Sequence, residues 1–343
     1  MNKLLTIVIP TYNMQAYLHR CLDSLLVSDE LMQSLEVLVI NDGSKDNSSA
    51  IAHEYEAKYP YTFRVIDKEN GNYGSCINRG LKEATGKYIK VLDADDWFDT
   101  EALEAYISKL SSIEADMIIT PYWIVDEQGT MQKEMVFDLE YEKVFSFQSY
   151  TNPAVYFAMH ALTYRTDMLR SINYTQTEGI SYTDTEWVFY PQHAVNTCVY
   201  LPNNLYRYVV GREGQTMDPK VLIKSAGHYD KLLRSMVKFA NSLSSDAKEL
   251  YSYQRIEAQI THLSMGVYRT CLVLQNADSW DKALLSSFDE FMRKERPNIY
   301  KQAGELKLKK HLPIHYVRYW RMTGKRFSVD RIRDTYRKIR YGK

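Results

Sequence analysis

Short apolar runs alternate with helical stretches over the first 120 residues. Five of the runs read as strands, at 6–10, 36–40, 63–66, 88–92 and 116–120. Between them, apolar residues recur at helical spacing, as in 16–26, 48–59 and 77–84. Strands that alternate with helices form a mostly parallel sheet flanked by helices. The sequence therefore predicts an α/β domain with a Rossmann-like sheet.

Polar loops follow four of these strands. They read TYN, NDGSKD, KENGNYG and DADD in chain order. In open α/β sheets, ligands bind beyond the carboxyl ends of the strands, and parallel strands place those ends at one edge. We therefore expect the four loops to converge on one ligand site.

The acidic loop is the most informative of the four. Asp93, Asp95 and Asp96 directly follow an apolar strand in the stretch KYIKVLDADDW. Carboxylates are rarely buried unpaired, and a hard cation that carries phosphate oxygens on its other side would use them. A structural alternative is that these residues only start the next helix, with Asp99 or Thr100 as its cap. That alternative explains Asp99 but neither Asp93 nor Asp95.

The glycine-containing loops predict a nucleotide ligand. Asp42 has the chemistry to accept hydrogen bonds from a ribose or base edge, and Gly43 allows close backbone approach. Gly71 and Gly74 would let their loop lie against the same ligand. These loops contain neither GxGxxG nor GxxxxGK[ST], so neither a dinucleotide fold nor a P-loop is supported. Without such a phosphate cradle, a divalent metal is needed to neutralise a diphosphate.

Four motifs together carry a family resemblance: IVIPTYN (7–13), VINDGSKDNS (39–48), ENGNYGSCINRG (69–80) and ATGKYIKVLDADDW (84–97). In order and spacing they resemble the family-2 glycosyltransferases, bacterial polysaccharide-type enzymes of the GT-A fold. The resemblance extends over about the first 215 residues. It implies transfer of a sugar from a nucleotide sugar, usually a UDP-sugar, with inversion at the anomeric carbon.

The resemblance also implies which residues bind the donor. Asp93 and Asp95 look like the Asp-x-Asp pair that takes the ribose and Mn²⁺ or Mg²⁺, with Asp95 as the direct metal ligand. Ile77 stands where many members carry an arginine, and Arg79 is the nearest alternative. Arg212 suits the leaving diphosphate, because a guanidinium matches phosphate geometry, and a solvent-exposed turn is the equally weighted structural alternative. The full set expected at the donor is Pro10, Thr11, Tyr12, Asp42, Asn72, Gly74, Asp93, Ala94, Asp95 and Arg212.

A second acidic stretch, EGISYTDTEWVFY, contains the candidate catalytic base. An inverting transfer needs one carboxylate to take a proton from the acceptor hydroxyl. The resemblance assigns this role to Asp184, with Glu186 as the alternative. A structural reading makes Thr183 a helix N-cap with Glu186 as its capping-box partner, and leaves Asp184 unexplained. Acceptor contacts are expected from Glu186, Trp187 and His160, although a structural role suits both Trp187 and His160 as well.

A helical region follows. Apolar residues recur at three and four spacing in 221–242, 247–274 and 280–294. We expect two domains, a nucleotide-sugar-binding catalytic domain at 1–218 and a helical domain at 219–343.

The formal net charge of zero conceals a basic C-terminal segment. Residues 301–343 hold fourteen Lys and Arg against three acids, a net charge of +11. Basic residues interleaved with aromatics favour a helix on an anionic membrane surface. A solvated helix packed on the body is the structural alternative, and nucleic acid is the least favoured partner.

The remaining composition bounds the location. No stretch approaches the ~20 apolar residues of a membrane span. The four cysteines form no CxxC pair, so we expect reduced thiols and no zinc site. These features predict a cytoplasmic protein that is peripheral on the inner face of the cell membrane through 301–343. They are also compatible with a homo-oligomer.

The sequence thus predicts a metal-dependent, inverting glycosyltransferase of the hexosyl- or N-acetylhexosaminyl-transferase class. Its donor is a nucleotide sugar, and its acceptor is a saccharide or lipid-linked acceptor in cell-surface polysaccharide synthesis. One alternative is a sugar nucleotidyltransferase, but the glycine-rich loop with Arg and Lys that such enzymes place after their first strand is absent from TYNMQAYLHR. The other is a catalytically silent nucleotide-sugar-binding protein of the same fold.

Overall fold

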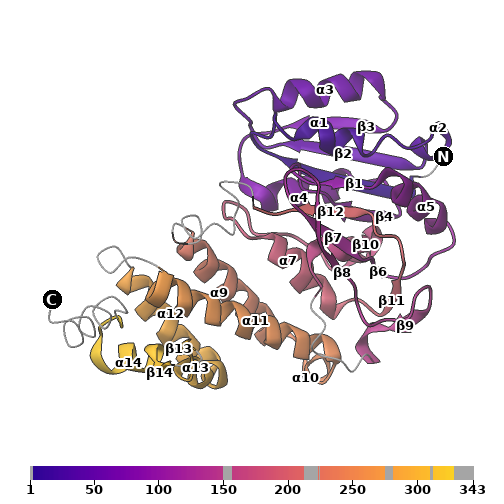
Figure 1. Cartoon of the computed structure of the whole chain (residues 1–343). Coiled ribbons are helices and arrows are strands. Elements are labelled where there is room, and N and C mark those ends of the chain that lie inside the picture. The colour runs from indigo at the N-terminus through magenta and orange to yellow at the C-terminus, as the bar shows by residue number, and fades with distance from the viewer. Residues whose placement is uncertain are drawn as a thin grey trace. The chain divides into compact units, whose positions relative to one another are not determined.

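A large central sheet organises the first part of the chain (Figure 1). The computed structural model describes residues 3–149, 157–211, 223, 225–274, 281–309 and 312–327. By its internal contacts, the chain divides into two compact units. Unit 1 comprises Met1–Gln215 and Ser244–Ile256, and unit 2 comprises Thr216–Leu243 and Glu257–Lys343.

The sheet of unit 1 has eight strands among the described residues, in the order β3-β2-β1-β4-β10-β6-β11-β9. The first half is parallel and contains β3 (Phe63–Asp67), β2 (Leu35–Asn41), β1 (Leu5–Thr11) and β4 (Tyr88–Val91). The second half is mixed and contains β10 (Leu162–Arg165), β6 (Met117–Ile119), β11 (Thr197–Tyr200) and β9 (Val144–Ser146). The predicted α/β fold is confirmed, and the five predicted strands correspond to β1, β2, β3, β4 and β6.

Helices cover both faces of the parallel half. The chain moves outward from β1 to β2 and β3, and then returns across β1 to β4. Because such crossovers are right-handed, the helices of the outward path and the return path lie on opposite faces. The outward path contains α1 (Leu18–Asp23), α2 (Asp29–Met32) and α3 (Ser48–Lys58), and the return path contains α4 (Asn72–Glu83). The strand order therefore reverses between β1 and β4, which is where ligands bind in open α/β sheets.

A smaller sheet stands beside the acidic loop. It has the order β5-β12-β7-β8, with β5 (Trp97–Phe98), β12 (Tyr206–Val209), β7 (Tyr122–Val125) and β8 (Met131–Met135). A turn that includes 127–129 joins β7 to β8, and Gly129 adopts a φ of 85° there. Asp99 caps α5 (Thr100–Leu110) by accepting from the amide of Ala102 at 3.0 Å, as one reading of the sequence predicted. Short helices complete the unit: η1 (Phe147–Ser149), η2 (Met159–Ala161), α6 (Thr166–Ser171), α7 (Asp184–Phe189) and η3 (Tyr190–His193).

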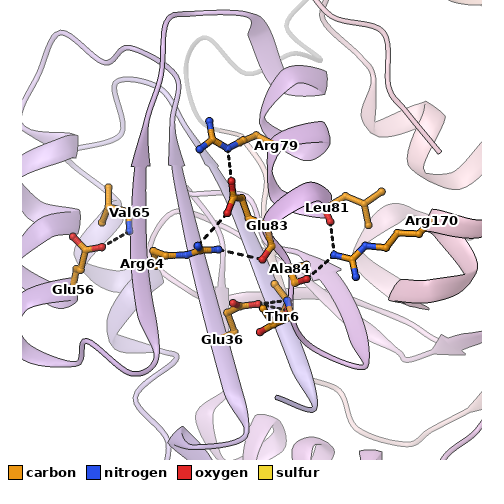
Figure 2. Close-up of polar contacts among 11 residues, drawn as sticks. Thr6, Glu36, Glu56, Arg64, Val65, Arg79, Leu81, Glu83, Ala84 and Arg170 are labelled. Carbon is orange, nitrogen blue, oxygen red and sulfur yellow. Dashed lines mark hydrogen bonds and ion pairs between the residues drawn. The ribbon is translucent and has the colours of Figure 1, made fainter. Parts of the chain in front are cut away.

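Figure 2 shows a set of hydrogen-bonded polar residues at the end of the sheet where the parallel strands begin. Glu36 accepts from the hydroxyl of Thr6 at 2.6 Å and from the amide of Thr85 at 2.7 Å. The guanidinium of Arg170 donates to the carbonyls of Leu81 and Ala84, at 3.0 and 2.6 Å (Figure 2). These carbonyls end α4, and Arg170 supplies the partners that a helix C-terminus lacks.

Residues 244–256 return to unit 1 after the chain has entered unit 2. They include α10 (Ser245–Lys248) and the start of α11 (Tyr251–Arg269). The ring of Tyr251 meets Phe147 edge-on at 5.5 Å. Arg255 lies over the ring of Phe157 at 5.2 Å and donates to the amide oxygen of Gln192 at 3.3 Å.

Unit 2 is mainly helical, as predicted. Beside the rest of α11 it contains α9 (Ala226–Ser242), η4 (Thr270–Leu274), α12 (Lys282–Glu295), α13 (Pro297–Gly304), the hairpin of β13 (Lys307–Lys309) and β14 (Leu312–His315), and α14 (Tyr316–Thr323). Arg321 of α14 pairs with Asp289 at 2.6 Å and stacks on Tyr300 at 3.5 Å, which fixes α14 to α12 and α13. The last part of the basic segment, 328–343, lies outside the described residues. In the described part of the chain, no helix combines the length and apolarity that crossing a membrane requires.

Candidate functional site

Hydrogen bonds join the four polar loops, as the sequence predicted. The amide of Asn13 donates to the hydroxyl of Ser44 at 3.0 Å, which links the loop after β1 to the loop after β2. Lys68, after β3, pairs with Asp42, after β2, at 2.5 Å. The hydroxyl of Tyr73 donates to Oδ1 of Asp93 at 2.7 Å and so links the third loop to the acidic loop. The four loops therefore form one continuous edge.

A pocket of about 520 Å³ opens at the first three loops. It is lined by Tyr12, Asn41, Gly43, Lys45, Asp67, Lys68, Glu69 and Asn70. Tyr12 is 45% exposed, so its ring is available to a planar ligand. Asp67 is held from behind, since it accepts from Asn41 at 2.6 Å and from His53 at 2.9 Å. The hydrogen bonds from His53, Asn41 and Ser49 hold the pKa of Asp67 below its ordinary value against the opposing effect of burial.

Asp42 lies buried beside this pocket. Its Oδ1 accepts from Lys68 and, at 2.9 Å, from the amide of Gly71. Asn70 donates to the Asp42 carbonyl at 2.9 Å, and Gly43 follows with a φ of 73°. These contacts fix the Asp42 carboxylate beside the pocket.

The acidic turn is tied to β12 through Asp96. The hydroxyl of Tyr206 donates to Oδ2 of Asp96 at 2.7 Å, and the amide of Val209 donates to Oδ1 at 2.7 Å. The same hydroxyl accepts from the amide of Asp93 at 3.2 Å. Burial, and then the charges of Asp95 and Asp93, raise the pKa of Asp96 well above its ordinary value. Asp96 therefore acts as the anchor of the turn.

Helix α1 supports the same turn from the opposite side. Arg20 donates to the carbonyl of Asp95 at 3.2 Å and to that of Glu127 at 2.9 Å, and its guanidinium lies 3.9 Å from the ring of Trp97. A Cβ added to Gly129 would lie 3.5 Å from Trp97, so the β7–β8 turn packs on that ring as well. Arg20 thus joins the backbone of a predicted metal ligand to the neighbouring hairpin.

One group of side chains near the turn has the composition of a cation site. Ligand atoms of Asp93, Asp96 and His160 all lie within 4.8 Å of one another. Lys90, fully buried, donates to the carbonyl of His160 at 2.8 Å. Burial, and then the charge of Lys90, lower the pKa of His160 to about 3, so the imidazole is neutral. Two carboxylates and a neutral imidazole fit a divalent transition metal.

Segment 176–179 fastens α4 to α7. Asn78 donates to the carbonyl of Gln176 at 3.0 Å and accepts from its amide at 2.7 Å. Glu186 then accepts from the amide and the hydroxyl of Thr177, at 2.6 and 2.7 Å. A Cβ on Gly74 would lie 2.3 Å from the carbonyl oxygen of Thr177, so only glycine permits this approach. Gly74, predicted as a donor contact, makes room for this segment.

The predicted base stands at the start of α7. Asp184 is exposed, yet the protein atoms around it desolvate the carboxyl and raise its pKa. Its charge contributes to the raised pKa of Tyr73, after burial and Asp93, which puts it in the electrostatic environment of the acidic turn. The predicted capping box is wrong: the Thr183 hydroxyl is buried without a partner among the described residues, and Glu186 binds Thr177 instead.

The other predicted site residues occupy varied positions. Pro10 and Thr11 end β1, Asn72 starts α4 with a φ of 64°, and Ala94 is buried within the acidic turn. Trp187 is a core residue, with its ring edge-on to Tyr164 at 5.2 Å. Arg79 pairs with Glu83 at 2.9 Å (Figure 2). Arg212 lies outside the described residues.

The motifs and the fold both have known counterparts. Residues 6–171 match the model of Glycosyl transferase family 2. This segment covers just under half of the chain and contains all four motifs. Glycosyltransferase GlyA of Streptococcus pneumoniae serotype 4 is 31% identical to it over 142 residues, 41% of this chain and 20% of that protein. The chain spans between a fifth and two fifths of the length of the first curated relatives that it matches.

Two solved structures share the fold of this chain. S. aureus TarS, residues 1–349, superposes with a TM-score of 0.60 at 19% identity, over 86% of this chain and 82% of that one. The mannosyltransferase PcManGT from Pyrobaculum calidifontis, in complex with GDP-Man and Mn²⁺, gives a TM-score of 0.53 at 14% identity, over 88% and 83% of the two chains. The GT-A fold is therefore confirmed.

Three residues that shape the loop edge and the acidic turn were missed from the sequence. Tyr73 lies within the ENGNYG motif, where its aromatic ring between two small residues was the available signal. Lys68 carried a weaker signal, as the one cation of the KENGNYG loop. Arg20 carried none, because a basic residue on an exposed helix position is ordinary and its partners are 75 and 107 residues away.

Proposed function

We propose that this protein is a metal-dependent, inverting glycosyltransferase that moves a sugar from a nucleotide sugar, a UDP-sugar, to a saccharide or lipid-linked acceptor. The observation that carries the proposal is the hydrogen-bonded continuity of the loops after β1, β2, β3 and β4. The family 2 match supports glycosyl transfer. TarS shares this fold, and its structure in complex with UDP-GlcNAc superposes on this chain with a TM-score of 0.55. This likeness supports a nucleotide-sugar donor.

The donor would lie along the loop edge. The pocket beside Tyr12 takes the base, and Asp42 receives its hydrogen bonds. Asp93 and Asp95 take the ribose and hold Mn²⁺ or Mg²⁺. When bound, the cation supplies positive charge to the leaving diphosphate. Tyr73 and Arg20 keep the two aspartates in place, through the Asp93 carboxylate and the Asp95 carbonyl.

Asp184 would act as the general base. Its carboxylate takes the proton of the acceptor hydroxyl while the hydroxyl oxygen attacks the anomeric carbon. The bond from that carbon to the diphosphate breaks, and the nucleoside diphosphate leaves with the bonding electrons from the opposite face, so the configuration inverts. The raised pKa of Asp184 makes it a stronger base than an ordinary aspartate.

The acceptor would be part of a cell-surface polysaccharide or its lipid-linked precursor. The net charge of +11 over 301–343 supports an anionic acceptor or a position on the inner face of the membrane. Exposed Tyr319 and Met322 on α14 supply apolar side chains beside Arg318, which suits an interfacial helix.

The test is turnover by the purified full chain. The protein is incubated with Mn²⁺ and one of three donors: UDP-GlcNAc, UDP-glucose or GDP-mannose. Each donor is tested with and without saccharide and lipid-linked acceptors. We expect release of UDP from at least one UDP-sugar, and an inverted anomeric signal in the product by NMR. If no nucleotide sugar is hydrolysed or transferred and calorimetry finds no nucleotide binding, the proposal is rejected.

Asp184→Asn separates an enzyme from a catalytically silent binder. An enzyme should lose turnover by ~10²- to 10⁴-fold while keeping its nucleotide affinity, because a general base contributes about that much. A binder should lose nothing. A nucleotidyltransferase would instead release pyrophosphate from a nucleoside triphosphate and a sugar phosphate, which a pyrophosphate assay detects.

A further inference from the structure

His160 lies beside the acidic turn, and one of its ring nitrogens has no hydrogen-bond partner among the described residues. Only 8% of the residue is exposed. Its Nδ1 is buried and has no hydrogen-bond partner in the described part of the chain. Buried side-chain nitrogens are nearly always partnered, so an orphaned one points to a ligand. A ring nitrogen of His160 lies within 4.8 Å of carboxylate oxygens of Asp93 and Asp96, so the ring is within reach of a cation held at the acidic turn.

The surrounding structure fixes the orientation of this ring. It stacks on Tyr208, with centroids 4.0 Å apart and planes inclined by 30°. Tyr206 meets its edge at 4.8 Å, and Tyr122 lies at 5.2 Å. The ammonium of Lys90 donates a hydrogen bond to the His160 carbonyl at 2.8 Å. An imidazole that is locked on several sides is preorganised to coordinate, since little freedom remains to be lost.

The two carboxylates of the group differ in what already engages them. Both oxygens of Asp96 accept hydrogen bonds, from Tyr206 and Val209. Asp96 is also 1% exposed, whereas Asp93 is half-buried, with its Oδ1 accepting from the hydroxyl of Tyr73. Asp96 therefore serves as the anchored outer carboxylate, and Asp93 is the one that reaches the ligand together with His160.

We propose that His160 is a nitrogen ligand of the divalent cation, alongside Asp93, and that it makes the site prefer Mn²⁺ to Mg²⁺. The inference deepens the proposed function, because it assumes that the donor site holds a cation. Mg²⁺ takes oxygen ligands and near-octahedral geometry, so an imidazole adds little for it. Mn²⁺ lies among the first-row metals that accept both carboxylate and imidazole ligands.

Pulsed EPR tests the coordination directly. Protein labelled with ¹⁵N-histidine is mixed with Mn²⁺ alone and with Mn²⁺ plus UDP. We expect an electron spin echo modulation from a directly bound ¹⁵N nucleus. His160→Phe, which keeps a ring to stack on Tyr208, should abolish it. His262→Asn should retain it, because His262 is an exposed residue of α11 and serves as the matched control.

The wild-type spectrum keeps the test independent of whether a variant folds. Bound Mn²⁺ without nitrogen modulation overturns the proposal, even where UDP binds normally. No bound Mn²⁺ in either sample also overturns it. Failure of the proposed function is a separate result, namely no UDP binding and no turnover. Even then, nitrogen coupling with Mn²⁺ alone would still show that a histidine binds the cation.

Metal selectivity gives a second readout. Calorimetry in the presence of UDP should show Mn²⁺ affinity falling ~10- to 100-fold in His160→Phe, with Mg²⁺ affinity changed much less. His160→Asn serves as a second variant, and thermal unfolding without metal checks that both fold. If either variant keeps its Mn²⁺ affinity and raises only the KM of the acceptor, His160 contacts the acceptor and the metal-ligand assignment is wrong.

Discussion

The hydroxyl of Tyr73 donates a hydrogen bond of 2.7 Å to Oδ1 of Asp93. This bond joins the first turn of α4 to the acidic turn after β4, two segments 20 residues apart. Burial first, and the charge of Asp93 second, raise the pKa of the Tyr73 hydroxyl well above its ordinary value, so it stays protonated and can only donate in this pair. This bond therefore links the orientation of Asp93 to the loop that lines the pocket beside Tyr12.

Tyr73→Phe removes this hydrogen bond and keeps the ring. A hydrogen bond to a charged group contributes about 1.5–3 kcal/mol, so we expect the KM for the Mn²⁺ complex of the nucleotide sugar to rise ~10-fold or more. Initial rates at varied Mn²⁺ measure this change. Tyr61→Phe is the control, because Tyr61 is 89% exposed, and it should behave as wild type. Equal KM values for the two variants would contradict the role of Tyr73.

Arg20→Gln tests the support of the acidic turn by α1. The change removes the donors to the carbonyls of Asp95 and Glu127 and the stacking on Trp97. We expect donor affinity, measured by calorimetry with UDP and Mn²⁺, to fall about 10-fold, since outer partners of metal ligands typically matter by that much. Arg293→Gln is the control, as its 65%-exposed side chain makes a long ion pair of 3.8 Å with Glu290. An unchanged affinity in Arg20→Gln would show that Asp95 does not need this support.

Gly74→Ala tests the approach of segment 176–179 to α4. The added Cβ would lie 2.3 Å from the Thr177 carbonyl oxygen, so the backbone must shift. We expect a loss of about 1–3 kcal/mol in the free energy of unfolding, together with reduced turnover, because α7 is attached through this segment. A Cβ added to Gly266 in α11 would meet no atom of the described residues within 4 Å. Gly266→Ala should therefore leave the free energy of unfolding unchanged or raise it by ~0.5–1 kcal/mol. Urea unfolding compares the two, and similar values would refute the steric reading.

The raised pKa of Asp184 has opposite consequences for activity and stability. Activity needs the carboxylate, so the acid limb of the rate profile should lie at higher pH than an ordinary aspartate would give. Stability favours the neutral form: the penalty of the desolvated charge is absent below the unfolded pKa of about 3.9 and complete above the raised folded pKa. Asp184→Asn should therefore be inactive but more stable than wild type at neutral pH, and this difference should vanish in acid. Thermal unfolding at a series of pH values checks the sign.

Glu36→Gln should affect stability without affecting the donor site. Glu36 joins β1, β2 and the segment before β4 at the end of the sheet away from the loops (Figure 2). Losing its two charge-assisted hydrogen bonds should cost about 1–3 kcal/mol of unfolding free energy, with UDP affinity unchanged. Glu54→Gln, at an exposed position of α3, is the matched control. A loss of nucleotide affinity in Glu36→Gln would mean that the two ends of the sheet are coupled.

The sequence determined the parallel half of the sheet well, and for a physical reason. Strands β1 and β2 are buried on both faces, so their apolar runs are continuous and easy to recognise. The convergence of the four polar loops on one edge of the sheet could be predicted from the order of strands and helices alone. The small sheet of β5, β12, β7 and β8 was harder, because its exposed strand β8 reads MQKEM and has no apolar run.

The side-chain contacts of the site were less predictable. Glu186 fitted a capping box by spacing, but its carboxylate faces Thr177, nine residues earlier, since tertiary packing outweighs a local cap worth about 1 kcal/mol. His160 and Asp93 stand 67 positions apart along the chain, and their proximity depends on β10 pairing with β4. The local sequence pattern carries no information about distances that arise from pairing between remote strands.

The return of residues 244–256 to unit 1 has a practical consequence for anyone who shortens this protein. A fragment ending near 218 would retain every family motif but would lose Tyr251 from Phe147 and Arg255 from Gln192. It would uncover the buried ring of Phe147 and remove one hydrogen-bond donor from the amide oxygen of Gln192. A catalytic fragment should instead keep 244–256, for example by joining that segment to the end of unit 1 through a flexible linker.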